Sequence, residues 1–127
     1  MVVSSTMLLD SNIIIYTGLP QYSKLRNWLS SNNIAVSDIS RLEVLGYHQL
    51  VAKDRTYFEN LFQQFDLFKI NSEIIDLAIL FRQQKSMSLG DAIIAATAKI
   101  NKLPLVTANA RDFKHLEDIE LINPLAI

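Results

Sequence analysis

Short apolar runs alternate with longer amphipathic segments along the whole chain. Runs bounded by polar turns are typical of buried strands, whereas apolar residues three or four positions apart are typical of helices that cover a sheet. This pattern predicts strands at 6–9, 34–36, 67–70, 103–107 and 119–122, and helices at 13–16, 21–31, 40–51, 56–65, 72–84, 92–101 and 113–117. Strands that alternate with helices indicate an α/β fold of three layers with a mainly parallel sheet.

The composition fits a single globular domain that covers residues 1–127. Of these residues, 50% are hydrophobic and 20% are charged, which allows one compact core. The chain has no cysteine, so any metal ion must be held by oxygen or imidazole ligands. The longest apolar runs fall well short of the roughly 20 residues that span a bilayer, and the first residues lack the pattern of a signal peptide. We therefore expect a soluble protein of the cytoplasm with no membrane contact.

Charge, glycine and histidine content narrow the function. The net charge of −1 provides no positive field over the whole molecule, which lowers the expectation of nucleic-acid binding but leaves room for local contacts. The three glycines are too far apart for a phosphate-binding loop or a dinucleotide fingerprint. His48 and His115 are not spaced as a zinc pair, and we expect His48, on the predicted 40–51 helix, to have a packing or surface role.

Four acidic residues follow breaks in the pattern. Asp10 directly follows the first predicted strand, Glu43 lies in the helix after the second, and Asp112 lies in the turn after the fourth. Because ligands of parallel sheets bind beyond the carboxyl ends of the strands, we expect these three side chains to converge there. Asp91 is not placed by the same reasoning, since two helices separate it from the strand before it.

Each acid also has a purely structural explanation. The serine three residues before Glu43 and the serine three residues before Asp91 resemble helix caps, and such a cap stabilises a helix by about 0.5–2 kcal/mol. Asp10 suits a helix N-cap or a turn, and Asp112 suits the first turn of a short helix. These explanations treat each residue separately and predict no convergence.

Convergent carboxylates would instead form a metal site. At about 4 Å and an effective dielectric constant of about 20, two bare carboxylates repel by about 4 kcal/mol, which a divalent cation relieves. Mg²⁺ or Mn²⁺ prefers such ligands and can activate water for attack on a phosphodiester. Polar neighbours that could orient the ligands or the water, or equally be ordinary turn residues, are Ser11, Asn12, Thr107 and Asn109.

Four segments of the chain resemble the signature blocks of PIN-domain ribonucleases and stand in the order that this family has. They are LLDSNI at 8–13, SRLEV at 40–44, LGDAIIAATA at 89–98 and LVTANARDF at 105–113. The match covers nearly the whole chain. The size and the single domain resemble the VapC-type toxins of bacterial and archaeal toxin–antitoxin pairs.

The resemblance implies a Rossmann-like PIN fold and an endoribonuclease that depends on Mg²⁺ or Mn²⁺. It also implies RNA as the substrate, a small antitoxin protein that blocks the pocket, and a homodimer. The implied metal ligands and catalytic residues are Asp10, Glu43, Asp91 and Asp112. The residues implied to line the pocket, support Asp10 or contact the RNA backbone are Thr107, Asn109, Ser11, Asn12 and Arg111.

Two alternatives remain beside an active ribonuclease. Asp38 adds an acid near Glu43, where we expect a neutral residue, but it removes no ligand; an inactive PIN-like scaffold that acts as a protein-binding module is therefore the second choice. A phospho-acceptor signalling domain is the third. It would need a lysine near the acceptor aspartate, and no lysine directly follows Thr107 or stands at a comparable strand end.

Overall fold

The structure is a computed structural model that describes residues 6–126. The strands are β1 (Thr6–Leu9), β2 (Asn33–Ser37), β3 (Asp66–Phe68), β4 (Leu105–Val106) and β5 (Leu121–Ile122). The helices are α1 (Ser11–Thr17), α2 (Ser23–Ser30), α3 (Asp38–Leu45), α4 (Ala52–Gln64), α5 (Ser72–Gln84) and α6 (Leu89–Ile100). Single 3-10 turns are η1 (Pro20–Tyr22), η2 (Ala110–Asp112) and η3 (Pro124–Ala126).

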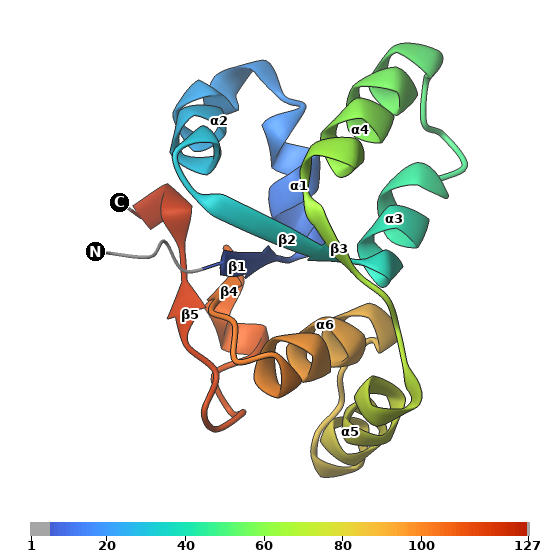
Figure 1. The fold of residues 1–127 in the computed structure, drawn as a ribbon, viewed down its shortest axis with the longest axis vertical. Helices are drawn as coiled ribbons and strands as arrows, with labels where there is room; N and C mark the ends of the chain where they lie inside the picture. The colour runs from blue at the N-terminus through green and yellow to red at the C-terminus, as the bar shows by residue number, and fades with distance from the viewer. Residues whose placement is uncertain (1–5, 127) are drawn as a thin grey trace.

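The strands form one sheet in the order β3-β2-β1-β4-β5, and each neighbouring pair is parallel. Helices α1 to α4 lie on one side of the sheet, and α5 and α6 lie on the other (Figure 1). The predicted three-layer α/β fold with a mainly parallel sheet is confirmed. Within residues 6–126, no helix is both long and apolar enough to cross a membrane.

Strand β1 anchors both hydrophobic cores because successive side chains of a strand point to opposite faces. Met7 and Leu9 pack in the core under α1, α2 and α4, whereas Leu8 packs in the core under α5 and α6. Leu8 and Leu9 are completely buried, at 0% exposure. Truncation of either to alanine should cost about 2–5 kcal/mol of stability. The strand that ends at Asp10 is thus fixed from both sides.

The order of the strands places the topological switch point of the sheet between β1 and β4. The chain leaves β1 toward β2 on one side and later returns to β4 on the other, and ligands bind at such switch points. The Leu8 amide donates to the Pro104 carbonyl at 2.9 Å, and the Asp10 amide donates to the Val106 carbonyl at 3.0 Å. The carboxyl ends of these two strands therefore lie side by side.

Helix α3 begins earlier than the predicted 40–51 helix. The side chain of Ser37, not that of Ser40, caps it by accepting a hydrogen bond from the Ile39 amide at 3.1 Å. The expectation that Ser40 caps a helix at Glu43 is therefore wrong. Ser40 and Glu43 both lie inside α3, about one turn apart on neighbouring positions of its surface.

Helix α3 also ends earlier than predicted. The Gly46 amide donates to the Leu42 carbonyl at 2.9 Å, and a Cβ atom at position 46 would collide with that oxygen. His48 consequently lies outside the helix, with its ring edge against Tyr47 at 5.2 Å between centroids, and the next helix, α4, begins at Ala52. The helical placement of His48 was wrong.

The segment 113–117 is not the predicted helical turn. The 3-10 turn η2 comes before it, and Phe113 and Leu116 are buried in the core beside α6, at 1% and 7% exposure. Asp118 then adopts a left-handed backbone conformation with φ of 62°. The segment forms hydrogen-bonded turns, such as the bond from the Leu116 amide to the Phe113 carbonyl at 3.0 Å, and it is anchored by the burial of these two side chains.

Candidate active site

A small cavity of about 80 Å³ lies beyond the carboxyl ends of the central strands. All four acids singled out in the sequence line it, although they come from four different parts of the chain. The complete lining is Asp10, Ser11, Asn12, Glu43, Asp91, Asn109, Asp112 and Phe113. Asp91, which strand topology left unplaced, is brought here by the first turn of α6.

Asp10 is held by the backbone on both of its sides. Its amide is bonded to β4, and its side chain caps α1 by accepting a hydrogen bond from the Ile13 amide at 2.9 Å. Only 4% of the residue is exposed. The expected N-cap role and the place in the cavity are therefore compatible, because Asp10 caps α1 and also lines the cavity.

Burial raises the pKa of Asp10 above its ordinary value. Hydrogen bonds from the Thr107 side chain and the Ile13 amide lower it, and the negative charges of Asp91 and Glu43 raise it further. Thr107 is completely buried at the end of β4 and also accepts a hydrogen bond from the Asn109 amide at 3.0 Å. It thus lies behind Asp10 rather than on the cavity wall.

Glu43 is held by side chains alone. The Ser11 hydroxyl donates to Glu43 Oε1 at 2.7 Å, and the hydroxyls of Ser11 and Ser40 lie 2.9 Å apart. A serine has one hydroxyl proton, so Ser11 gives its proton to Glu43 and accepts one from the buried Ser40. A short relay of hydroxyl groups from α1 and α3 thus orients the carboxylate.

Gly90 lies directly against the Glu43 carboxylate. A Cβ atom at position 90 would be 2.5 Å from Glu43 Oε2, 2.7 Å from Oε1 and 2.8 Å from Cδ. The Glu43 carboxylate therefore occupies the space that a side chain at position 90 would need.

Asp91 occupies the third position of α6. The Ser88 hydroxyl caps this helix by accepting a hydrogen bond from the Asp91 amide at 3.1 Å, as the sequence predicted. Burial raises the pKa of the Asp91 carboxyl, a hydrogen bond from the Ser88 side chain lowers it, and the charges of Asp112 and Glu43 raise it again. The pKa values of Asp10 and Asp91 are therefore both raised, chiefly by burial and further by the neighbouring negative charges.

The donor set fits Mg²⁺ or Mn²⁺ by its chemistry. The cavity lining offers carboxylates, two side-chain amides and a hydroxyl, and it has no histidine. A divalent cation would stabilise the charged form of Asp10 and Asp91, which burial and the neighbouring negative charges disfavour. Among residues 6–126, however, no three acidic or histidine side chains are already grouped closely enough to hold one ion. The ligands would have to draw together slightly to bind it.

Two larger hollows adjoin the cavity and share its acids. A polar hollow of about 280 Å³ contains Asp91 and Asp112 and is lined further by Lys85, Ser86, Met87, Ser88 and Arg111. A mostly apolar hollow of about 380 Å³ contains Glu43 and is lined further by Ile15, Gly18, Leu19, Val44, Tyr47, Gln49, Leu50, Asp54 and Phe58. Arg111 thus lies beside the cavity, not in it.

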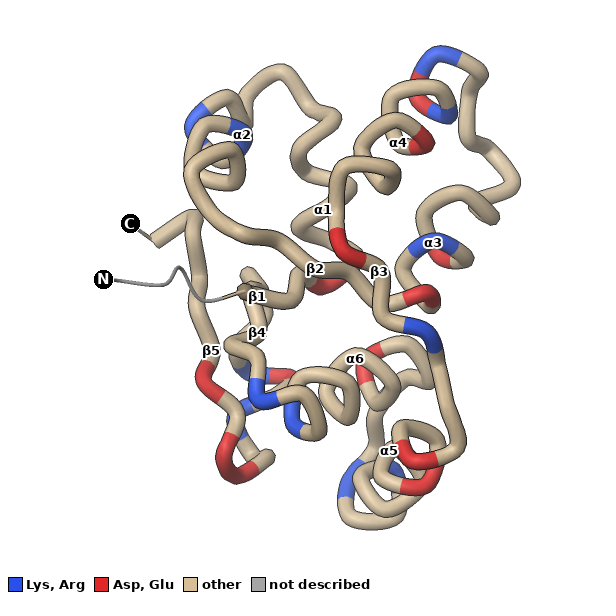
Figure 2. The backbone as a smooth tube through the Cα atoms, viewed as in Figure 1, with Lys and Arg blue, Asp and Glu red and all other residues tan. Residues whose placement is uncertain are grey.

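Asp38, the additional acid, stays apart from the cavity. It forms an ion pair with Arg41 at 2.9 Å and lines a separate hollow on the outside of α3. Figure 2 shows lysine and arginine spread over several helices and loops, in keeping with the absence of an overall positive field.

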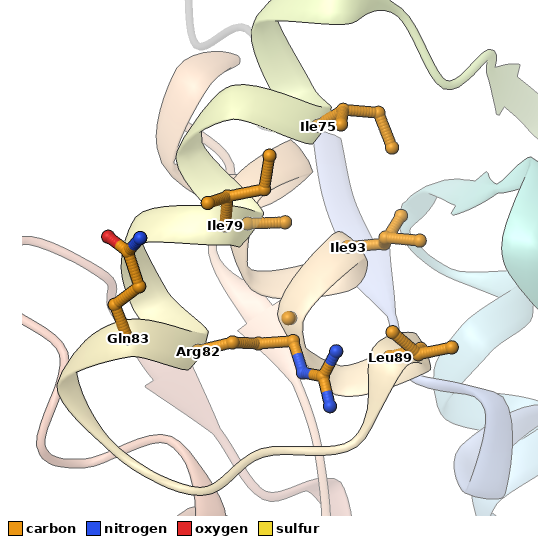
Figure 3. A pocket seen from close by; sticks show the side chains of 8 residues that line it. Ile75, Ile79, Arg82, Gln83, Leu89 and Ile93 are labelled. Atoms are coloured by element: carbon orange, nitrogen blue, oxygen red, sulfur yellow. The ribbon is translucent and has the colours of Figure 1, made fainter.

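A further hollow of about 390 Å³ lies between α5 and α6, away from the acids. Figure 3 shows Ile75, Ile79, Leu89 and Ile93 around it, with Arg82 and Gln83 at one end. Ile79 is 49% exposed and Leu89 is 63% exposed, so this face is open and apolar.

Sequence reasoning missed two residues that position the acids. Ser40 was interpreted as a helix cap, and Gly90 was used only to exclude a phosphate loop. A signal for Gly90 was present, because glycine inside a helix costs roughly 1 kcal/mol relative to alanine and usually has a packing reason. Ser40 could be found only once the start of α3 was known.

Comparison with known proteins gives the same family as the four sequence blocks. No curated protein matches this chain. A toxin–antitoxin complex from Klebsiella pneumoniae is 27% identical, with a TM-score of 0.72 over 93% of this chain and 97% of that chain. FitAcB from Neisseria gonorrhoeae is 23% identical, with a TM-score of 0.77 over 95% and 99% of the two chains.

VapBC2 from Rickettsia felis, bound to a DNA fragment from its promoter, is 21% identical, with a TM-score of 0.78 over 93% of this chain and 98% of that chain. The similarities to FitAcB and to VapBC2 are similarities of fold alone, because their sequence identities are low. The family model described as PIN domain matches residues 7–119, which is most of the chain. This chain therefore belongs to the PIN-domain family.

Proposed function

We propose that this chain is a metal-dependent endoribonuclease and the toxin of a type II toxin–antitoxin pair. The observation that carries the proposal is the convergence of Asp10, Glu43, Asp91 and Asp112 on one cavity. Family membership supports a nuclease, and the toxin–antitoxin complex that is 27% identical supports the toxin role. The proposed metal ligands are these same four acids, with Mg²⁺ or Mn²⁺ as the ion.

The proposed chemistry is hydrolysis of an RNA phosphodiester. A divalent ion in such a site supplies a water nucleophile at neutral pH and stabilises the leaving oxygen. Asp10 and Asp91 would supply fixed negative charge from the sheet edge and from the first turn of α6. The side-chain amides of Asn12 and Asn109 face the same cavity and would orient the attacking water or a phosphate oxygen.

The polar hollow is the proposed place for the RNA backbone. Lys85 and Arg111 line it beside Asp91 and Asp112, and neither forms an ion pair with another residue of the described chain. Two unpaired cations next to the cavity suit the phosphates that flank a scissile bond. Such an enzyme acts on cellular RNA, so we expect it to work in the cytoplasm.

The apolar hollow is the proposed site of the antitoxin. It shares Glu43 with the acidic cavity and is otherwise lined largely by apolar side chains such as Leu19, Leu50 and Phe58. An apolar segment of a small antitoxin protein seated there would cover one side of the cavity and hinder RNA. The similarity to the toxin–antitoxin complex from Klebsiella pneumoniae, at 27% identity, supports such a partner.

The open apolar face of α5 and α6 is the proposed contact of a homodimer (Figure 3). Exposed apolar patches of this kind mark protein contacts more often than plain surface. Replacement of Ile79 by lysine should leave the fold intact and yield a monomer in light scattering. A wild-type chain that is already monomeric would contradict the homodimer without touching the nuclease.

The test of the nuclease is RNA cleavage with Mg²⁺ or Mn²⁺ by the wild type, by Asp10→Asn and by Asp91→Asn. Asp76→Asn is the matched control, because Asp76 is exposed on α5 and lines none of the hollows. We expect cleavage by the wild type and the control only. Equal activity in all four proteins contradicts the proposal. If no protein cleaves RNA and Asp10→Asn still binds its partner, the chain is an inactive scaffold.

A further inference from the structure

Gly90 and Glu43 are in closer contact than a side chain at position 90 would allow. All three of the nearest atoms to a Cβ built there belong to the Glu43 carboxylate group, at 2.5, 2.7 and 2.8 Å. No backbone atom is among these three. The missing side chain of Gly90 therefore makes room for a carboxylate rather than for the packing of two helices.

The hydroxyl relay fixes the same carboxylate. Ser11 donates to Glu43 Oε1 at 2.7 Å, and Ser40 supports Ser11 at 2.9 Å. Glu43 is exposed and belongs to α3, so without these contacts its long side chain would be free to turn into solvent. Between the relay and Gly90, the carboxylate is held beside the first turn of α6, the turn that carries Asp91.

We propose that Gly90 is a positioning residue for metal binding: its lack of a side chain lets the Glu43 carboxylate lie against the first turn of α6, within reach of an ion held by Asp91. The inference rests on the proposed metal-dependent function. It assigns to Gly90 no contact with substrate or with the ion. The role of Gly90 is to set the position of the Glu43 carboxylate before the ion binds.

The fold itself has no need of glycine at position 90. The atoms in the way of a Cβ are the far end of a flexible side chain, which can rotate away without moving the backbone. Alanine also favours a helix over glycine. In Gly90→Ala, stability and metal binding should therefore change in opposite directions, and a merely structural role predicts that both fall.

The experiment compares the wild type, Gly90→Ala, Glu43→Ala and the double variant, each as the full chain. Mn²⁺ binding is measured by calorimetry, thermal unfolding is measured with EDTA present, and crystal structures are determined without metal. We expect Gly90→Ala to bind Mn²⁺ about 10–100-fold more weakly. Its Tm should be unchanged or higher by up to about 4 °C.

The double variant separates positioning from a general effect on α6. Once Glu43 is alanine, Gly90→Ala should change Mn²⁺ affinity no further. In the crystal structure of Gly90→Ala, the hydrogen bond from the Ser11 hydroxyl to Glu43 Oε1 should be lost. If Glu43 keeps its place and Mn²⁺ affinity is unchanged, the role of Gly90 is overturned and the proposed function stands. If the wild type binds no Mn²⁺ and cleaves no RNA, the proposed function is overturned, and this inference with it.

Discussion

Asp10 and Glu43 face the same cavity but reach it in different ways. Asp10 stands at the end of a strand that is buried on both faces, and its own amide and carboxylate are bonded to backbone groups of β4 and α1. Glu43 is an exposed residue of α3; its carboxylate is held by the Ser11 hydroxyl, which Ser40 supports, and lies in the space left by the missing side chain of Gly90. The first acid is positioned by the fold, and the second is positioned by three small side-chain choices.

This difference predicts two kinds of mutational behaviour. Changes near Asp10 act on a rigid, electrostatically crowded position, where fold stability and ligand binding are linked. Changes near Glu43 act on a side chain that can move at little cost to the fold. Variants near Glu43 should therefore lose metal affinity with little loss of stability. Variants near Asp10 should change both metal affinity and stability.

The largest expected effect is that of Asp10→Asn. Asparagine can cap α1 as aspartate does, so the fold should persist. RNA cleavage should fall by at least about 100-fold, because a fixed charge in the reaction site is lost. Single-turnover cleavage against the Asp76→Asn control measures the loss, and a loss below tenfold would place Asp10 outside the reaction.

The same variant should be more stable than the wild type when metal is absent. Burial holds the pKa of Asp10 above its unfolded value, so the folded state binds more protons than the unfolded state between the two pKa values. Stability conferred by this group is then present at low pH and lost as the pH rises from about 4 through the folded pKa. Urea unfolding in EDTA should show a steeper loss of stability with rising pH in the wild type than in Asp10→Asn.

Metal binding should offset the lower stability that the wild type has, relative to Asp10→Asn, when metal is absent. An ion that binds only the folded state adds about 2.7 kcal/mol to the free energy of unfolding at 100 times its Kd. Mn²⁺ should therefore raise the Tm of the wild type clearly and that of Asp10→Asn much less. Equal stabilisation of both proteins would show that the ion binds away from the cavity.

On the Glu43 side, Ser11→Ala should weaken Mn²⁺ binding by about tenfold. The reason is that Glu43 loses the hydroxyl that orients it, while Asp10 and its cap are untouched. Stability in EDTA should stay nearly constant, in contrast to Asp10→Asn. Ser30→Ala is a suitable control, since the Ser30 hydroxyl donates a hydrogen bond to the Asn27 carbonyl near the end of α2.

The smallest expected effect is that of Lys85→Ala in the polar hollow. Loss of one phosphate contact should raise KM for RNA by about threefold and leave kcat unchanged. The slope of log affinity against log salt should fall by about 0.7 for single-stranded RNA. Lys24→Ala, an exposed lysine on α2, should change neither quantity.

The same contrast explains what could be predicted from the sequence. Strand β1 was predicted at its observed bounds, and so was α5, because each has an apolar pattern that matches its burial. The position of Asp10 follows from β1. The relation of Glu43 to Gly90 does not, since it depends on how α3 and α6 meet.

The errors have the same origin. Two serines near the start of α3 could each cap it, and local pattern cannot choose between Ser37 and Ser40. The choice is made when β2 extends to Ser37, and this fixes which face of α3 carries Glu43 toward Ser11. Asp91 was placed only through the family resemblance, because the path of α5 and α6 is set by their packing on the sheet.

The short strand β5 has a consequence for local opening. It has two residues, Leu121–Ile122, and its pairing with β4 includes the bond from the Thr107 amide to the Ile122 carbonyl at 2.9 Å. Thr107 in turn gives Asp10 one of its stabilising hydrogen bonds. A brief detachment of this edge strand, visible as fast amide hydrogen exchange at Thr107, would loosen the otherwise rigid side of the cavity. Strand β5 therefore helps to hold Asp10 in place through Thr107, although of the four acids Asp10 lies farthest from β5 in the sequence.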